Sequence, residues 1–178
     1  LFSVGVHPWH AAVKTLSEII PALHHKNCRA LGEVGLDRLK GPSMEIQHAM
    51  LLAQLTLANE LQKPVIFHLV RAWDEFYSLI KTQQHTPWII HGFNSPKQFP
   101  RLIQTKVFFS LGPASLQNPH MQSILSKIPL NRMIQQAILI KSTSTIPKPP
   151  PPHSKKYMLK LNRIFWLFLV HESLVRTI

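Results

Sequence analysis

Three short apolar runs in this sequence each lead into a side chain that can bind a metal ion. The first run is followed by Glu33, residues 64–67 are followed by His68, and residues 87–90 are followed by His91. Each run has the length and apolar composition of a buried strand. Glu33 and His68 are 35 positions apart and His68 and His91 are 23 apart, so each interval has room for one helix and two turns. The pattern predicts the order strand, ligand, helix, repeated along the chain.

This repeated order favours an α/β architecture with one functional edge. Parallel strands joined by crossover helices bring their carboxyl ends to the same side of the sheet, so residues far apart in sequence meet there. We therefore expect Glu33, His68 and His91 at one edge of a parallel sheet. Gly32 and Gly35 flank the carboxylate, and residues without a side chain let backbone and ligand approach closely.

Length and composition fit one globular domain. The chain has 178 residues, of which 45% are hydrophobic, enough for a sizeable core. Its single cysteine, Cys28, excludes an internal disulfide and fits a reducing compartment, so we expect a cytoplasmic protein. We expect no signal peptide, because residues 1–5 lack a basic region followed by a long apolar core. The apolar stretch 164–170 is far shorter than the roughly 20 residues that span a bilayer. The sequence does not set the oligomeric state.

The net charge of +12 is unevenly distributed. Residues 141–178 hold seven Lys or Arg and one acid, and residues 1–140 hold thirteen and seven, so half of the charge lies in the last fifth of the chain. A mildly basic body is typical of a solvated surface and also of a phosphate-binding patch. Charge alone therefore leaves both interpretations open.

Apolar periodicity, capping residues and prolines predict further elements. We expect a strand over 2–6, helices over 11–25, 43–62 and 72–84, a helix start at Ser95 and Pro96, a strand over 107–111, and a short helix from Asn118 to about residue 127. After Asn131 the pattern changes, because Pro147 and the prolines of 149–152 favour extended chain and residues 157–170 are basic and aromatic. We predict a domain over 1–133 and an irregular, basic, Pro-rich tail over 134–178.

Glu33, His68 and His91 form a ligand set of one carboxylate and two imidazoles, which suits Zn²⁺, Mn²⁺ or Mg²⁺. A carboxylate can bridge two ions while each imidazole binds one, so the site could take one or two metals. Paired ions of this kind clamp the attacking and leaving oxygens of a phosphate ester. A single histidine at a strand end is more often a hydrogen-bonded structural residue, and spacing alone does not decide between the two roles.

Five short motifs occur in an order and spacing that resemble one protein family. They are GVHP at 5–8, GEVGLD at 32–37, PVIFH at 64–68, HGF at 91–93 and FSLG at 109–112. Together they resemble the TatD family of metal-dependent deoxyribonucleases. The resemblance implies a TIM-type (β/α) barrel of the metal-dependent hydrolase superfamily, of which this chain would supply about five of eight strands, the second to the sixth. It also implies hydrolysis of ester bonds, with DNA as the substrate.

The resemblance assigns roles to individual residues. Glu33 matches the metal-bridging carboxylate, the residue we expect to be catalytic, and His68 and His91 match terminal metal ligands. His7 matches a position near the site, where we expect contact with a substrate phosphate or support of a ligand rather than metal binding. Arg71 lies just beyond His68, where some relatives carry a basic residue. Phosphate contact and a solvated helix start are equally good interpretations of Arg71.

Two family features are absent from this sequence. A His-x-His strand would precede Leu1, and a strand ending in Glu-Thr-Asp, whose aspartate binds metal, would lie where residues 134–140 contain no acid. No Asp or Glu occurs between Glu75 and Glu172, and a frameshift near residue 134 would explain the missing aspartate and the unusual tail. We therefore expect a truncated hydrolase with impaired or no activity. The alternatives are a non-catalytic product and a superfamily hydrolase of a small phosphoester or amide.

Overall fold

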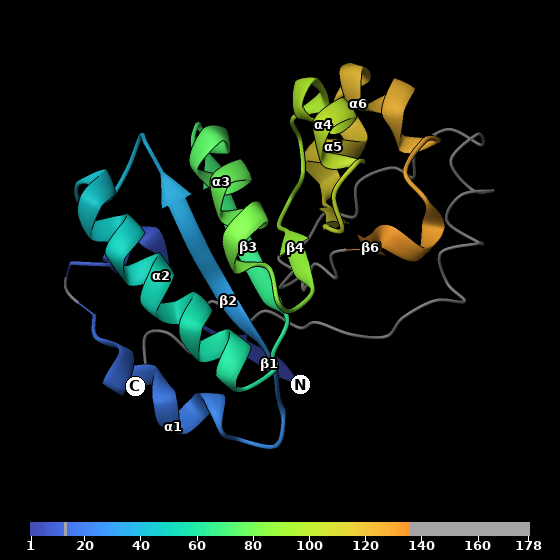
Figure 1. The fold of residues 1–178 in the computed structure, drawn as a ribbon. Helices are drawn as coiled ribbons and strands as arrows, with labels where there is room; N and C mark the ends of the chain where they lie inside the picture. Colours follow the sequence, from blue (N-terminus) through green and yellow to red (C-terminus); the bar gives the residue numbers. More distant parts are fainter. Residues whose placement is uncertain (13, 136–178) are drawn as a thin grey trace, which may run out of the picture.

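The computed structural model describes residues 1–12 and 14–135 and shows six parallel strands in one sheet (Figure 1). The strands are β1 (Phe2–Val4), β2 (Cys28–Asp37), β3 (Val65–Val70), β4 (Trp88–Ile90), β5 (Phe108–Leu111) and β6 (Met133–Gln135). Each strand pairs in parallel with the next one in the chain. This order is that of a (β/α) barrel wall, so the α/β prediction is confirmed. The described part contains six strands, one more than the five expected.

Helices and short 3-10 turns connect the strands. The longer helices follow the first three strands and contribute to the same apolar core (Figure 1); they are α1 (Leu16–Leu23), α2 (Met44–Glu60) and α3 (Trp73–Gln83). The shorter elements are η1 (Pro8–His10), η2 (Pro96–Gln98), α4 (Phe99–Leu102), α5 (Pro113–Gln117), α6 (Pro119–Leu125) and η3 (Leu130–Arg132). Each crossover returns the chain to the start of the next strand, so all carboxyl ends lie at one edge.

Two apolar clusters pack against the strands. The main core lies under the helices and includes the buried rings of Phe67, Phe76 and Trp88, whose centroids are between 4.5 and 5.6 Å apart. The smaller cluster joins side chains of successive strands, namely Ala30, Ile66 and Ile89 with Phe108 and Ile134. Strands that carry apolar residues on both faces are typical of parallel sheets.

The two longest helices begin and end close to their predicted limits. Helix 43–62 is observed as α2, whose first turn is capped by the Ser43 hydroxyl, and it ends before Pro64. Helix 72–84 is observed as α3, with Asp74 and Glu75 in the first turn, where acidic side chains favour the helix dipole. The sequence did not predict α5. Its first residue, Pro113, follows a strand directly, and a proline there can end a strand as well as begin a helix.

The first predicted helix is too long. Within the described residues of the range 11–25, the one helix is α1, which begins after Thr15. The Thr15 backbone N–H donates to a Glu18 carboxylate oxygen at 3.0 Å, half of a capping box that sets the start of the helix. The apolar periodicity continues upstream of this cap, and for that reason it overstates the length of the helix.

The predicted tail lies almost entirely outside the described residues. The predicted boundary between residues 133 and 134 falls inside β6. Most of the predicted tail, and most of the segment 134–140 where the family has its aspartate, belongs to residues 136–178, which lie outside the described part. The domain boundary, the irregular tail and the frameshift all stay predictions. Among the helices of residues 1–12 and 14–135, none combines the length and apolar composition needed to cross a bilayer.

Candidate metal centre

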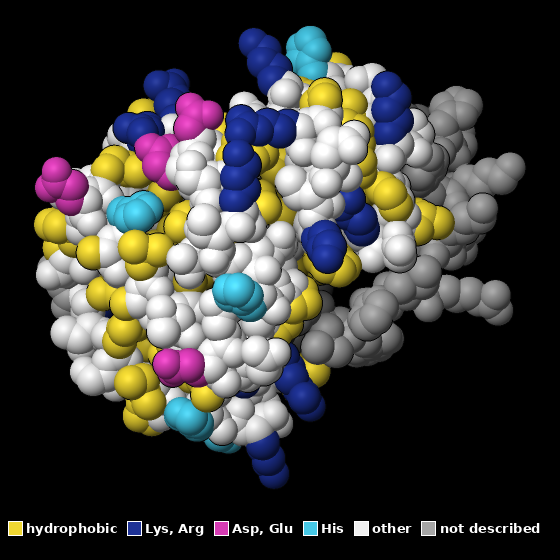
Figure 2. Space-filling view, in the orientation of Figure 1, with side chains coloured by type: hydrophobic (Ala, Val, Ile, Leu, Met, Phe, Trp, Pro, Cys, Tyr) yellow, Lys and Arg dark blue, Asp and Glu magenta, His cyan; other side chains and the backbone are white. Residues whose placement is uncertain are grey.

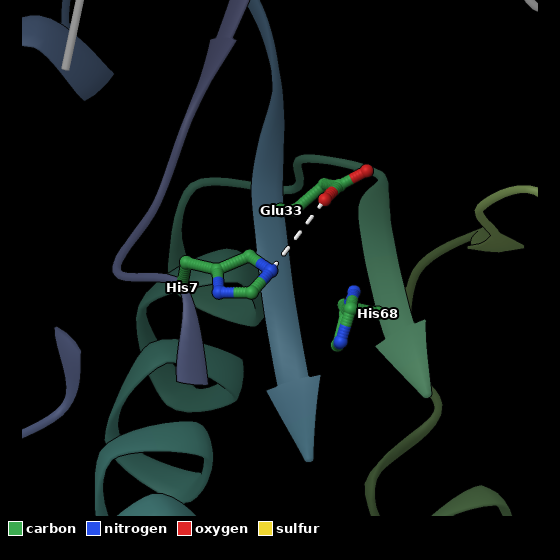
Figure 3. Close-up of side chains that lie close together, drawn as sticks. All are labelled: His7, Glu33 and His68. Carbon is green, nitrogen blue, oxygen red and sulfur yellow. Dashed lines mark ion pairs between the residues drawn. The ribbon is translucent and has the colours of Figure 1, made fainter. Parts of the chain in front are cut away.

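The carboxyl edge of the sheet brings together four side chains singled out in the sequence. His7 follows β1, Glu33 lies within β2, His68 lies within β3 and His91 directly follows β4. Their side chains are between 18% and 24% exposed, so they are shielded from solvent but still reachable. Figure 3 shows His7, from the chain after β1, lying close to Glu33 of β2 and His68 of β3.

Glu33 and His68 are not at strand ends, in contrast to the prediction. β2 and β3 both continue beyond them. Glu33 instead occupies a bulge between Gly32 and Val34, where the pairing of β2 with β3 skips one residue. A bulge re-aims a side chain without ending the strand, so the carboxylate turns toward the site from the middle of β2.

Two glycines permit the bulge and the close approach of β3. Gly32 has a φ angle of +154° and Gly35 one of +146°, values that other residues rarely adopt. A Cβ at Gly32 would lie 2.6 Å from the Ile66 Cβ, and a Cβ at Gly35 would lie 2.0 Å from the His68 carbonyl oxygen. The two strands are therefore closer together than side chains at these positions would allow.

The two carboxylate oxygens of Glu33 face different imidazoles. Oε1 lies 2.7 Å from His91 Nε2, and Oε2 lies 3.7 Å from His7 Nε2, the pair joined by the dashed line in Figure 3. Burial alone would raise the pKa of Glu33, but the hydrogen bond with His91 and the nearby rings of His68 and His7 lower it below its ordinary value. Glu33 is therefore ionised at neutral pH, as a metal ligand must be.

The His7 ring is neutral at pH 7. Burial and the neighbouring His68 ring lower the pKa of His7 from 6.5 to about 4. The centroids of these two rings are 4.4 Å apart. A neutral imidazole keeps a lone pair, which metal binding by a histidine requires.

Asp37, a carboxylate that the sequence pattern did not single out, lies within hydrogen-bond distance of His68. Asp37 Oδ2 lies 3.0 Å from His68 Nε2 and accepts a hydrogen bond from the Trp9 indole N–H at 2.7 Å. Asp37 Oδ1 accepts from the backbone N–H groups of Leu39 and Lys40 at 2.8 and 3.1 Å. Burial alone would raise the pKa of Asp37, but these hydrogen bonds lower it. The sequence signal for this role is that Asp37 ends the strand that carries Glu33.

Two buried glutamines of α2 secure the backbone beside the site. Gln54 accepts from the Val6 N–H at 2.7 Å and donates to the Val6 carbonyl at 3.1 Å, next to His7. Gln47 accepts from the Asp37 N–H at 2.8 Å and donates to the Asp37 carbonyl at 2.9 Å. Each amide thus satisfies a backbone donor and a backbone acceptor, and α2 sets the positions of two strand ends.

His7, Glu33 and His68 form a group that could hold a metal ion. One ligand atom of each lies within 4.8 Å of the other two. Ligands bound to one ion at about 2.0–2.2 Å lie up to about 4.4 Å apart, so small side-chain shifts would complete the site. Imidazole and carboxylate together suit Zn²⁺ and Mn²⁺. The donor set therefore fits the expected divalent metal, without selecting one ion.

The grouping differs from the roles implied by the sequence. His7, expected outside the ligand set, lies within the group, whereas His91, expected as a ligand, binds the other carboxylate oxygen of Glu33. Arg71 is exposed just after β3, has a φ angle of +54°, and has no bonded partner among the residues that the structure describes. The roles of these three side chains stay predictions.

Comparison with known proteins assigns these residues to a family. The family model described as TatD related DNase matches residues 1–135. The chain belongs to this family. A TatD relative from Rahnella sp., described as a 3'-5' ssDNA/RNA exonuclease, is 33% identical over 123 residues, which are 62% of this chain and 42% of that protein. The human deoxyribonuclease TATDN3 is 27% identical over 144 residues, 71% of this chain and 53% of that protein.

The TatD fold is also found among solved structures. The crystal structure of YjjV, a TatD homologue from Escherichia coli, is similar with a TM-score of 0.66 and 24% identity, covering 89% of this chain and 66% of that one. This likeness shows the shared barrel fold. The present chain spans about half the length of the TatD relatives it matches in sequence.

Proposed function

We propose that this TatD-family chain carries the metal-binding part of a nuclease site that hydrolyses phosphodiester bonds of DNA. The observation that carries the proposal is the position of the Glu33 carboxylate. One of its oxygens faces His91 and the other faces His7. A ligand atom of His68 lies within 4.8 Å of those of Glu33 and His7. Divalent ions held there would polarise the phosphoryl group and provide a nucleophile at neutral pH.

Each side chain has a role in this proposal. Glu33 is the bridging carboxylate, and His68 and His91 are the terminal ligands. His7 presents a neutral ring 3.7 Å from the Glu33 carboxylate, within reach of either a metal or a substrate phosphate. Asp37 orients His68, because a carboxylate on the second ring nitrogen fixes an imidazole for metal binding. Arg71 supplies a positive charge at the rim for the phosphate.

The charge distribution supports a polyanionic substrate. Residues 1–75 hold seven Lys or Arg and seven Asp or Glu, whereas residues 76–135 hold six Lys or Arg and no acid. In Figure 2 the part of the surface formed by α4, α5 and α6 accordingly displays basic side chains without acidic ones. Such a surface attracts a phosphate backbone. The relatives described as a ssDNA/RNA exonuclease and a deoxyribonuclease support the same substrate class.

The cytoplasm is the location that we propose. Cys28, the one cysteine of the chain, is buried and free, as is usual in proteins kept in a reducing compartment. Imaging of a fluorescent fusion in the source cells tests this location.

The test of the activity is metal-dependent hydrolysis by the full chain. Labelled single-stranded and duplex DNA are incubated with Mn²⁺, Mg²⁺ or Zn²⁺, and a small phosphodiester is run in parallel. We expect Glu33→Gln to lower hydrolysis of DNA at least about 100-fold and to weaken metal binding. Glu60→Gln, which changes an exposed acid at the end of α2, is the matched control and should leave both unchanged.

Three results would contradict this proposal. Hydrolysis that persists in EDTA, or that is unchanged in Glu33→Gln, would remove the metal site from the reaction. Metal affinity that does not depend on Glu33 would do the same even for a chain without turnover. A preference for the small phosphodiester over DNA would favour the alternative of a small-ester hydrolase.

A further inference from the structure

Trp9 presents an exposed aromatic ring beside the candidate metal centre. Its side chain is 41% exposed, although large aromatic side chains are mostly buried. Trp9 lies in η1, and its ring centroid is 4.7 Å from that of His7 and 5.7 Å from that of His68. The exposed indole therefore borders the side chains that would hold the reacting phosphate.

Buried groups fix the position of Trp9. Its indole N–H donates to Asp37 Oδ2, the same oxygen that lies 3.0 Å from His68 Nε2, and Asp37 is only 3% exposed. The loop after β2 packs directly on η1, because a Cβ at Gly41 would lie 3.0 Å from the Trp9 Cα and 2.9 Å from the Pro8 carbonyl oxygen. The ring is thus held at a constant place relative to the metal-binding group.

The same loop places a cation on the indole. Lys40 Nζ lies 4.5 Å from the centroid of the Trp9 ring. The Lys40 backbone is held at both ends, since its N–H donates to Asp37 and its carbonyl accepts from Gln47. Within residues 1–12 and 14–135, no carboxylate pairs with the Lys40 ammonium. An aromatic ring and an unpaired ammonium are the two groups that bind a base and its phosphate in single-strand sites.

We infer that Trp9 and Lys40 form a subsite for one nucleotide of single-stranded nucleic acid. The base stacks on the exposed indole, displacing the flexible Lys40 side chain, whose ammonium then contacts the adjacent phosphate. This inference rests on the proposed function, because it takes the group around Glu33 as the place of the next phosphodiester. Every base has a stacking face, so the subsite accepts all bases, and it selects single strands because bases in a duplex are stacked on one another.

A structural role for Trp9 makes a different prediction. If Trp9 served only to bond Asp37, the indole N–H would be the group that matters, and Trp9→Phe and Trp9→Leu would be equally harmful. Stacking depends on the aromatic face, which phenylalanine keeps and leucine lacks. The comparison of these two variants therefore separates the subsite from simple support of Asp37.

The experiment measures binding of a short fluorescent oligodeoxythymidylate to the full chain by anisotropy, in EDTA so that no hydrolysis occurs. We expect Trp9→Leu to weaken binding about five- to 150-fold and Trp9→Phe to weaken it less. Lys40→Gln should weaken binding and reduce the slope of log affinity against log salt by about 0.7. Ile20→Ala and Lys26→Gln, exposed changes in and after α1, are the matched controls and should bind like the unsubstituted chain.

Equal affinity of Trp9→Leu and the unsubstituted chain would overturn the subsite, as would equal losses in Trp9→Leu and Trp9→Phe. An abasic oligonucleotide gives a test without any substitution, because the unsubstituted chain should bind it more weakly, and equal binding would overturn the inference. Binding that depends on Trp9 in a chain without Glu33-dependent hydrolysis would support the subsite while contradicting the proposed activity. Glu33-dependent hydrolysis by a chain whose binding does not depend on Trp9 would support the proposed activity and contradict the subsite.

Discussion

His68 Nε2 lies 3.0 Å from Asp37 Oδ2, which joins the neighbouring strands β3 and β2 through one buried carboxylate. Metal-binding imidazoles commonly donate their second N–H to such a group, which fixes the ring and raises its basicity. With Nε2 bonded to Asp37, Nδ1 is the nitrogen of His68 that remains for a metal. The pairing of β2 with β3 therefore decides which nitrogen of His68 can bind a metal, because it places Asp37 beside the other one.

Asp37→Asn should weaken metal binding about 10- to 100-fold, because the neutral amide accepts a weaker hydrogen bond from His68 and no longer fixes the orientation of its ring. Isothermal titration with Mn²⁺ measures the change. Asp74→Asn, at a side chain that is 97% exposed, is the control with the same chemical change. Equal metal affinity in the two variants would show that Asp37 has no part in positioning His68.

Addition of Mn²⁺ should stabilise the chain. A ligand at 100 times its dissociation constant adds about 2.7 kcal/mol of unfolding free energy, which raises the melting temperature of a chain of this size by about 5–11 °C. Thermal unfolding with and without EDTA measures the shift. His68→Ala should remove it, whereas His120→Ala, at an exposed histidine of α6, should retain it. A shift that survives in His68→Ala would place the metal elsewhere.

Gly35→Ala should destabilise the fold by about 2–6 kcal/mol, because it combines a strained φ angle with a contact between the new Cβ and the His68 carbonyl. Urea unfolding followed by circular dichroism measures the loss. Gly92→Ala is the control, since Gly92 also has a positive φ of +55° but no atom lies within 4 Å of an added Cβ. Its cost should be only about 1–2 kcal/mol. Equal losses of unfolding free energy in the two variants would mean that β3 can move away from β2 to make room for the new Cβ.

Gln54→Leu should cost about 2–6 kcal/mol, because it leaves the Val6 N–H and carbonyl without partners in a buried place. The same unfolding measurement tests this value. Thr56→Ala, on the exposed side of α2, should change stability by far less. Stability unchanged in Gln54→Leu would indicate that water replaces the amide. A loss of metal binding in this variant would show that α2 also positions His7.

Local patterns were sufficient for much of the fold. The period of apolar residues and the Ser43 cap predict α2. The apolar run before His91 predicts β4 and therefore the position of His91 directly after a strand. That Glu33 and three histidines lie toward one edge follows from the general rule that parallel strands share the direction of their carboxyl ends, although Glu33 and His68 lie inside their strands. Each of these features depends on neighbours in sequence or on a property of all parallel sheets.

The sequence by itself determined the α/β class, the family and four of the side chains that meet at the carboxyl edge, but not Asp37. Only the tertiary structure decided how these side chains are held. The bulge at Glu33 depends on the register of β2 against β3, Asp37 meets His68 across 31 positions, and Gln54 meets Val6 across 48. Hydrogen bonds between such distant residues depend on strand register and on packing across layers, and no local pattern of residues contains that information.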